Sequence, residues 1–164
     1  MKLNFTLFLA AALTLGTLAA ASAQTAPEGQ LKVAGKTVKF TQVYAYAAEG
    51  FFDKATNDTI VLLTDHPLTN AQVHDRSALQ RLAQDGKLAY VQETISAAGK
   101  IINFTIGHQS FKAPPSGGST EHVFEGKIEP ASISGKVQTN GEQTSFGTKY
   151  EYEATFSAPV QSRK

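Results

Sequence analysis

The chain has 164 residues, of which 41% are hydrophobic and 18% charged, and it contains no cysteine. This composition is that of one globular domain with enough apolar side chains for a single core. Its 15 basic and 14 acidic residues are scattered rather than grouped. Because nucleic acids and anionic membrane surfaces attract a concentrated basic face, neither is expected as a partner.

Residues 1–23 have the features of a secretory signal peptide. Lys2 is followed by an uncharged, largely apolar run that ends in Ala21-Ser22-Ala23, with small residues at the two positions that a signal peptidase reads. Cleavage there would leave residues 24–164 as a single, formally neutral β-rich domain. An uncleaved membrane anchor is the competing interpretation, but polar residues and a glycine interrupt the run. We expect an exported protein, periplasmic or secreted, with no stable membrane insertion after cleavage.

The lack of cysteine bears on the origin of this exported chain. Small proteins that pass through the oxidising secretory route of eukaryotes usually carry disulfides. A cysteine-free sequence fits a bacterial periplasmic or secreted protein better. We therefore expect a bacterial source.

The first predicted elements after the leader are strands. Residues 24–29 are typical of a frayed start, and a strand then begins at Leu31, turns over 34–36 and resumes at Thr37. Apolar residues recur with period two along the resumed strand, and its last part is apolar on both faces, as expected for a strand that enters the centre of a domain. The residues that define its inner face are Val38, Phe40, Tyr44 and Tyr46.

The next predicted strand, Ile60–Leu63, has bulky apolar residues on both faces. Both faces must therefore be covered by other parts of the chain. A loop over residues 50–58 leads into this strand, and we expect Phe51 and Phe52 to be tucked under that loop.

A single helix is predicted over Arg76–Gln84, and it supplies the cover for the apolar strand. Asp75 precedes the helix as its N-cap, Gly86 follows its end, and its apolar residues form one stripe. Thr69 and Gln72 have the spacing of a capping box, which favours a helical turn just before the helix.

The rest of the chain is predicted to be β-structure. The expected strands are residues 88–96 and 100–107, joined as a hairpin, and then residues 120–127 and 131–138. A flexible run over residues 108–119 separates the hairpin from the later strands, and Asn140-Gly141 marks a turn. The last strand directs one apolar side inward, formed by Tyr150, Tyr152, Ala154 and Phe156.

Together these elements predict a mainly β fold, either an antiparallel β-sandwich or a flattened barrel of about seven or eight strands, with one short helix packed on it. Many of the strands are joined by tight turns. No repeat of the length found in solenoids or propellers occurs. The domain is therefore expected to be one unit.

Four stretches support a resemblance to known sequences. These are Val43–Ala47, Ile60–Asp65, Leu79–Lys87 and the closing Tyr150–Phe156. The chain resembles an uncharacterised group of small secreted bacterial β-rich proteins over most of its length after the leader. The resemblance implies export and a β-rich fold, and it implies no activity.

The stretch Asp65-His66-Pro67 follows the apolar strand directly and has two interpretations. Pro67 removes a backbone donor and disfavours a helical conformation at His66, so the stretch is a good strand end. Asp65 would then accept hydrogen bonds from nearby backbone N–H groups in an Asx turn. In the second interpretation, Asp65 and His66 bind a ligand at the rim of the sheet.

The histidines suggest a metal site as an alternative. Each lies near the predicted end of an element, and they are His66, His74, His108 and His122. If strand ends converge at one rim, two or three imidazoles with a carboxylate could bind zinc or copper. No motif with a specific metal-binding spacing occurs in the sequence.

Phe111 lies in a loop rich in proline, glycine and serine. A large ring in such a loop either pins the loop to the core or is available to a partner. We therefore include Phe111 with Asp65 and His66 among the candidate ligand-binding residues.

Motifs for catalysis are not found in the sequence. It has no cysteine nucleophile, no G-x-S-x-G elbow and no phosphate-binding loop. We therefore expect a non-catalytic, exported binding or interaction module with an unknown protein or small-molecule partner and no cofactor. The alternative is a metal-binding protein or metalloenzyme that uses clustered histidines.

Overall fold

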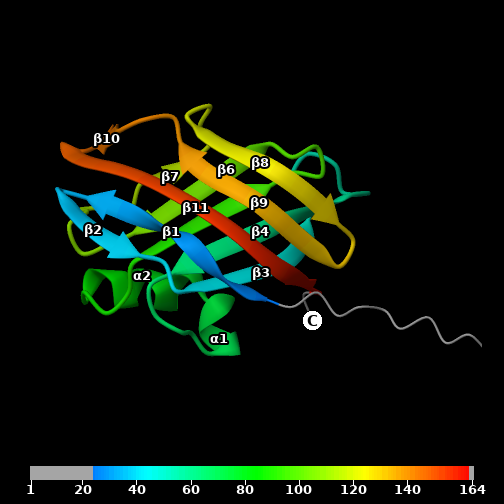
Figure 1. Cartoon of the computed structure of the whole chain (residues 1–164), viewed down its shortest axis with the longest axis horizontal. Helices are drawn as coiled ribbons and strands as arrows, with labels where there is room; N and C mark the ends of the chain where they lie inside the picture. Colours follow the sequence, from blue (N-terminus) through cyan, green and yellow to red (C-terminus); the bar gives the residue numbers. More distant parts are fainter. Residues whose placement is uncertain (1–23, 163–164) are drawn as a thin grey trace, which may run out of the picture.

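A computed structural model describes residues 24–162, so the predicted signal peptide lies outside the described residues. Within this range the chain is mainly β, as predicted (Figure 1). The strands are β1 (Thr25–Val33), β2 (Lys36–Lys39), β3 (Gln42–Glu49), β4 (Asn57–Thr64), β5 (Tyr90–Ile95), β6 (Ile101–Gly107), β7 (Ser116–Gly117), β8 (His122–Glu129), β9 (Ser132–Thr139), β10 (Gln143–Ser145) and β11 (Thr148–Gln161). The helices are α1 (Asn70–Val73) and α2 (Arg76–Gln84). Neither is long and apolar enough to cross a membrane.

The strands form one curled sheet with two wings. The first wing has the order β2-β1-β11-β9-β8, with β10 also paired to β11, and the second has the order β3-β4-β5-β6-β7. In Figure 1 the strands of the first wing cross in front of those of the second. The sheet is therefore a half-barrel and not a clear sandwich.

Strand β11 joins the two wings. Its middle pairs antiparallel with β1 on one side and with β9 on the other. Its end, at Val160 and Gln161, pairs in parallel with Ala45 and Tyr46 of β3. The prediction of a purely antiparallel sheet is therefore wrong, because one non-local pairing runs parallel.

The strand predicted to run without a break from Thr37 is two strands in the structure. The Phe40 N–H donates to Gly29 O at 3.1 Å, whereas the N–H of the next residue, Thr41, donates to Thr64 O at 2.8 Å. Adjacent residues thus bond to different wings, and the chain changes wing between β2 and β3. The prediction of one inner face formed by Val38, Phe40, Tyr44 and Tyr46 is therefore wrong. Val38 and Phe40 pack in the cluster between the wings, whereas Tyr44 and Tyr46 pack in the cluster under the helices.

The frayed start predicted for residues 24–29 is also wrong, since β1 begins at Thr25. Its first residues pair with the far end of β11, where Thr25 lies opposite Ser157 and Glu28 opposite Thr155. The register shifts between Thr25 and Glu28. These polar residues are ordered by a partner strand that is distant in the sequence.

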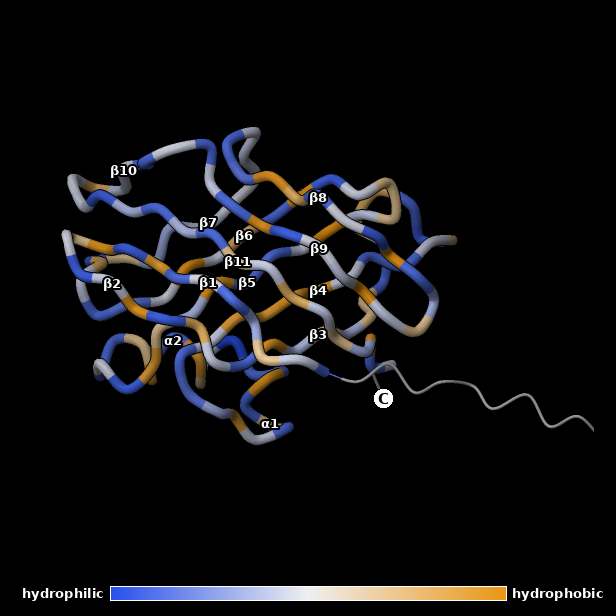
Figure 2. The backbone as a smooth tube through the Cα atoms, viewed as in Figure 1, coloured by the Kyte–Doolittle hydropathy of each residue, from blue (hydrophilic) through white to orange (hydrophobic). Residues whose placement is uncertain are grey.

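The core has two parts. The larger part fills the space between the inward faces of the two wings and includes Leu31, Val61, Val91, Ile106 and Phe156. Figure 2 shows the alternation of hydrophobic and hydrophilic residues along the strands that produces these faces. The smaller part lies between the helices and the other face of β4, so β4 is buried on both sides as predicted.

The helices follow the local signals in the sequence. Asp75 caps α2 by accepting a hydrogen bond from the Ala78 N–H at 3.0 Å, as predicted. Thr69 and Gln72 form the predicted capping box at the start of α1. Leu79 and Ala83 of α2 are buried in the same cluster as Leu62 of β4.

Leu62 therefore tests the central position of β4. Its side chain is fully buried, and Leu62→Ala should lower the free energy of unfolding by about 2 to 5 kcal/mol because it leaves a cavity under the helices. Ile60→Ala is the matched control, since it removes a side chain of equal size from a partly buried position on the same face, and it should cost less. Urea unfolding of both variants measures the losses. A loss below about 1 kcal/mol for Leu62→Ala would contradict the packing described above.

Candidate functional site

The richest set of ionisable side chains lies inside the core, where β5, β8 and β11 meet. His122 Nδ1 is 3.2 Å from Glu93 Oε1, and the Tyr152 hydroxyl donates a hydrogen bond to the same oxygen. The Tyr152 hydroxyl is also 3.0 Å from His122 Nδ1. On the other side of the imidazole, Nε2 is 3.4 Å from the Tyr150 hydroxyl. We call Glu93, His122, Tyr150 and Tyr152 the buried polar cluster.

Strand alternation positions each member of the cluster. Tyr150 and Tyr152 lie on the inward side of β11, as predicted. Glu93 is inward on β5 together with Val91 and Ile95. The ring of Phe104, which is opposite Glu93 in the hairpin, packs on the His122 ring with 3.8 Å between centroids.

Burial controls the electrostatics of the cluster. Glu93 is fully buried, and desolvation raises the pKa of its carboxyl group, although hydrogen bonding and charge from His122 and a hydrogen bond from Tyr152 oppose the shift. Burial, and then the charge of Glu93, raise the pKa of Tyr152 well above 10.0. Glu93 Oε2 has no hydrogen-bond partner in the described part of the chain. Both shifts favour the neutral acid forms of a carboxyl and a phenol.

Glu93 is absent from the candidate residues predicted from the sequence. The signal was present, because Glu93 has period-two spacing with Val91 and Ile95 and so belongs to the inward face of its strand. A glutamate at such a position is rarely fully buried without a partner. Its partner, His122, was a candidate only as a metal ligand.

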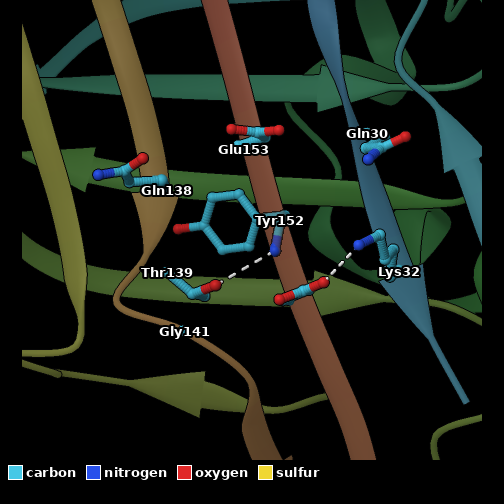
Figure 3. Close-up of a pocket in the computed structure, with 8 residues that line it drawn as sticks. Gln30, Lys32, Gln138, Thr139, Gly141, Tyr152 and Glu153 are labelled. Atoms are coloured by element: carbon cyan, nitrogen blue, oxygen red, sulfur yellow. Dashed lines mark hydrogen bonds and ion pairs between the residues drawn. The ribbon is translucent and has the colours of Figure 1, made fainter.

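A break in the sheet lies directly outside the cluster. The pairing of β9 with β11 ends at Gln138 opposite Glu153, and the pairing of β10 with β11 begins at Gln143 opposite Tyr150. In the gap, the Tyr152 N–H donates to the Thr139 hydroxyl at 3.3 Å, as Figure 3 shows. A side-chain oxygen thus replaces a backbone acceptor at this irregularity.

The hollow at this break is lined mostly by polar side chains. Its walls carry Gln30, Lys32, Gln138, Glu151 and Glu153 from the outer faces of β1, β9 and β11 (Figure 3). Lys32 Nζ and Glu151 Oε1 form an ion pair at 2.6 Å across it. Of the buried polar cluster, Tyr152 lines it, whereas Glu93 and His122 do not. The opening therefore gives a solute access to surface charges and not to the buried carboxyl–imidazole pair.

Asp65 fastens the end of β4 to the start of β5. Its Oδ1 accepts a hydrogen bond from the Ala89 N–H at 2.8 Å, and its own N–H donates to Ala89 O at 3.1 Å. The partner is thus a distant residue and not the local Asx turn suggested by the sequence. His66 is mostly exposed beside it, with Nδ1 at 3.1 Å from Asp65 Oδ1.

The other histidines have different surroundings. His74 packs edge-on against Tyr46 with 4.5 Å between ring centroids. His108 Nδ1 accepts a hydrogen bond from the Ser110 N–H at 3.1 Å, and burial lowers the pKa of His108. The remaining two contact separate carboxylates, one at the end of β4 and one in the core. Across residues 24–162, no three histidine, aspartate or glutamate side chains form a group that could hold a metal ion.

Phe111 pins its loop to the core. Only 7% of the residue is exposed, and its ring meets Tyr150 edge-on with 5.8 Å between centroids. Its N–H donates to His108 O at 3.1 Å. The segment predicted as a flexible run thus contains a buried anchor and the short strand β7, which pairs with β6.

Phe51 and Phe52 are exposed, so the prediction that they are tucked under their loop is wrong. They are 72% and 79% exposed, and their rings meet edge-on with 4.9 Å between centroids. They occupy the connection between β3 and β4, which projects from one end of the molecule (Figure 1). We call these two residues the Phe51–Phe52 tip.

Comparison of the chain with protein-family models, curated proteins and solved structures finds no match.

The raised pKa of Glu93 predicts a pH dependence of stability. In the folded state the Glu93 carboxyl keeps its proton at pH values above the ordinary glutamate pKa of 4.5. The stability that this proton contributes is therefore present below pH 4.5 and is lost as the pH rises through the folded-state pKa of Glu93. Glu93→Gln removes the titration and keeps an acceptor for Tyr152. Relative to wild type, the variant should therefore gain stability as the pH rises.

Urea unfolding of both proteins from acid to mildly alkaline pH measures this difference. Glu153→Gln, the same change at an exposed glutamate of β11, is the control for the loss of one carboxylate. Parallel pH profiles for wild type and Glu93→Gln would show that Glu93 titrates alike in the folded and unfolded chain, contrary to the account of the cluster.

Proposed function

We propose that the protein is an exported, non-catalytic interaction module of bacterial origin that contacts its partner through the Phe51–Phe52 tip. The observation that carries this proposal is the exposure of two adjacent phenylalanine rings on a loop that forms its own hydrogen bonds. Exposed apolar groups of this kind are characteristic of contact sites. Aromatic side chains also provide much of the binding energy at the centres of interfaces.

The loop that carries the tip is held in one conformation by its own hydrogen bonds. The Gly50 N–H donates to Thr56 O at 3.0 Å, and the Thr56 N–H donates to Asp53 O at 3.1 Å. The Phe51 N–H donates to the buried carboxylate of Asp58 at 2.8 Å. A preformed loop loses little conformational entropy on binding, so more of the contact energy remains as affinity.

The surroundings of the tip define the partner surface that it fits. Burying both rings would contribute about 3 to 6 kcal/mol, which requires an apolar pocket on the partner. At the base of the loop, Lys54 Nζ and Glu49 Oε1 form an exposed ion pair at 3.1 Å, and Asp53 lies next to Phe52. An apolar centre with a polar rim is the usual anatomy of a protein–protein contact.

The buried polar cluster supports a non-catalytic role. A general acid or base must come within hydrogen-bond distance of the group whose proton it moves. Glu93 is fully enclosed and the His122 side chain is only 1% exposed, and of the cluster only Tyr152 lines the hollow above them. The carboxyl–imidazole pair is therefore inaccessible to a substrate in this conformation.

The tip is tested by capture of partners from an envelope extract of the producing organism. The double variant Phe51→Asn with Phe52→Asn should lose the partner that wild type retains, because it removes the apolar contact. Phe146→Asn is the matched control, since Phe146 is also 79% exposed, on a different turn, and has a positive φ of 46° that asparagine tolerates. The free energy of unfolding of both variants should lie within about 1 kcal/mol of the wild-type value, because surface substitutions usually change stability little. Equal capture by the tip variant and wild type would refute the proposed contact.

A further inference from the structure

Strand β8 is an open edge of the sheet. Among the described residues it pairs with β9 on one side only, and it follows the upper border of the front wing in Figure 1. Its free side therefore presents backbone N–H and C=O groups to another strand. The edge strand at the opposite border, β2, is half as long and carries Lys36 and Lys39, which discourage such pairing.

The sequence of β8 is complementary to itself when read in the opposite direction. Its central residues are Phe124, Glu125, Gly126, Lys127 and Ile128. In an antiparallel pair of two copies centred on Gly126, Phe124 lies opposite Ile128 of the second copy. In the same register, Glu125 lies opposite Lys127 of the second copy. On either side of the central glycines, these contacts are therefore apolar with apolar and acidic with basic, and the twofold symmetry makes each contact twice. Farther out, Val123 lies opposite Glu129 of the second copy.

Neighbouring registers lose this match. A shift by two residues in one direction sets Glu125 opposite Glu125 of the second copy, and the same shift in the other direction sets Lys127 opposite its own equivalent. Like charges directly opposite one another destabilise a strand pair. A shift by one residue would turn the apolar side chains of one copy to the polar face of the other. The charges therefore select the register centred on Gly126.

The two faces of β8 fit a continued sheet. Phe124 and Ile128 are partly buried and pack against the main core, so a second copy would extend that apolar face. Glu125 and Lys127 are exposed on the other face. Glu125 is already opposite Lys136 of β9, whose Nζ is 3.1 Å from Glu153 Oε2. Lys127 of a second copy would lie on the other side of Glu125, so that basic, acidic and basic residues would follow one another across three neighbouring strands.

Glycine at the centre of the strand allows a close approach of the backbones. Gly126 is opposite Gly135 of β9, and a Cβ at Gly126 would lie 2.2 Å from Ser134 O and 2.6 Å from Cζ of Phe124. The Phe124 ring thus covers the paired glycines on the inner face. No side chain projects from Gly126 toward a second copy.

We propose that two copies of this chain associate through β8 in the antiparallel register centred on Gly126, forming a sheet that is continuous across a twofold axis. A second copy is the occupant that the charge pattern fits. This proposal is independent of the Phe51–Phe52 tip, which lies on a different connection.

The mass of the purified protein in solution, measured by sedimentation over a range of concentrations, tests this proposal. Wild type should have twice the monomer mass at high concentration and should dissociate on dilution, because one strand pair is a small interface. Lys127→Glu sets two carboxylates opposite one another and should be monomeric, and Glu125→Lys sets two ammonium groups opposite one another and should be monomeric too. Lys87→Glu, a matched change at an exposed lysine beyond α2, should dimerise like wild type.

Mixing the two monomeric variants gives the decisive result. A pair made of one Lys127→Glu chain and one Glu125→Lys chain restores both contacts between unlike charges, so the mixture should recover the twofold mass. A monomeric wild type, a Lys127→Glu protein that still dimerises, or a mixture that stays monomeric would each overturn the proposal. The double variant of the tip should dimerise like wild type. Loss of dimer in that variant would place self-association at the tip and would likewise overturn it.

Discussion

The two-sided pairing of β11 is the constraint on which the rest of the structure depends. Its middle residues are bonded to β1 and β9, and its last residues leave the first wing to pair with β3 of the second. The inward face of the same strand contributes Tyr150, Tyr152 and Phe156 to the core between the wings. One strand thus fixes the order of the first wing, connects it to the second and supplies the side chains that fill the space between them.

The buried polar cluster forms at the centre of this arrangement, and its members come from β5, β8 and β11. Burial of a carboxyl group and an imidazole in a core stabilises a fold less than apolar packing of equal volume. Hydrogen bonds are directional, however, so Glu93, His122 and Tyr152 meet correctly in only one alignment of the three strands. We interpret the cluster as a device that specifies how the two wings face each other. Under this interpretation, the proposed contacts with partners are made by the Phe51–Phe52 tip and by the open edge at β8.

Local signals made part of the fold predictable from sequence. The helix Arg76–Gln84, its aspartate cap and the capping box before it depend on residues within a few positions of one another, and all three are present. The burial of β4 on both faces followed from its continuous apolar run, and the inward face of β11 followed from period-two alternation. Both signals are also local. The change of wing at Phe40 and Thr41 depends on acceptors in two distant strands, so no nearby residue indicates it.

The candidate site was less predictable for the same reason. Phe111 was known to be either an anchor or a contact residue, and only the position of Tyr150 in space decides that it is an anchor. Phe51 and Phe52 were expected to be covered because apolar residues usually are, yet the loop satisfies its own hydrogen bonds and leaves them outside. Glu93 could have been found from its spacing, but its partner His122 is on another hairpin and can be assigned only from the three-dimensional arrangement.

The central claim is that the Glu93–His122 pair is enclosed by the fold, which is the basis for proposing contact through surface residues. A titration of the Glu93 carboxyl carbon by nuclear magnetic resonance in the folded protein tests it most directly. We expect this carbon to titrate above the ordinary glutamate value of 4.5. A Glu93 that titrates at or below 4.5 would show that His122 and Tyr152 outweigh desolvation, and it would contradict a neutral carboxyl in the enclosed cluster.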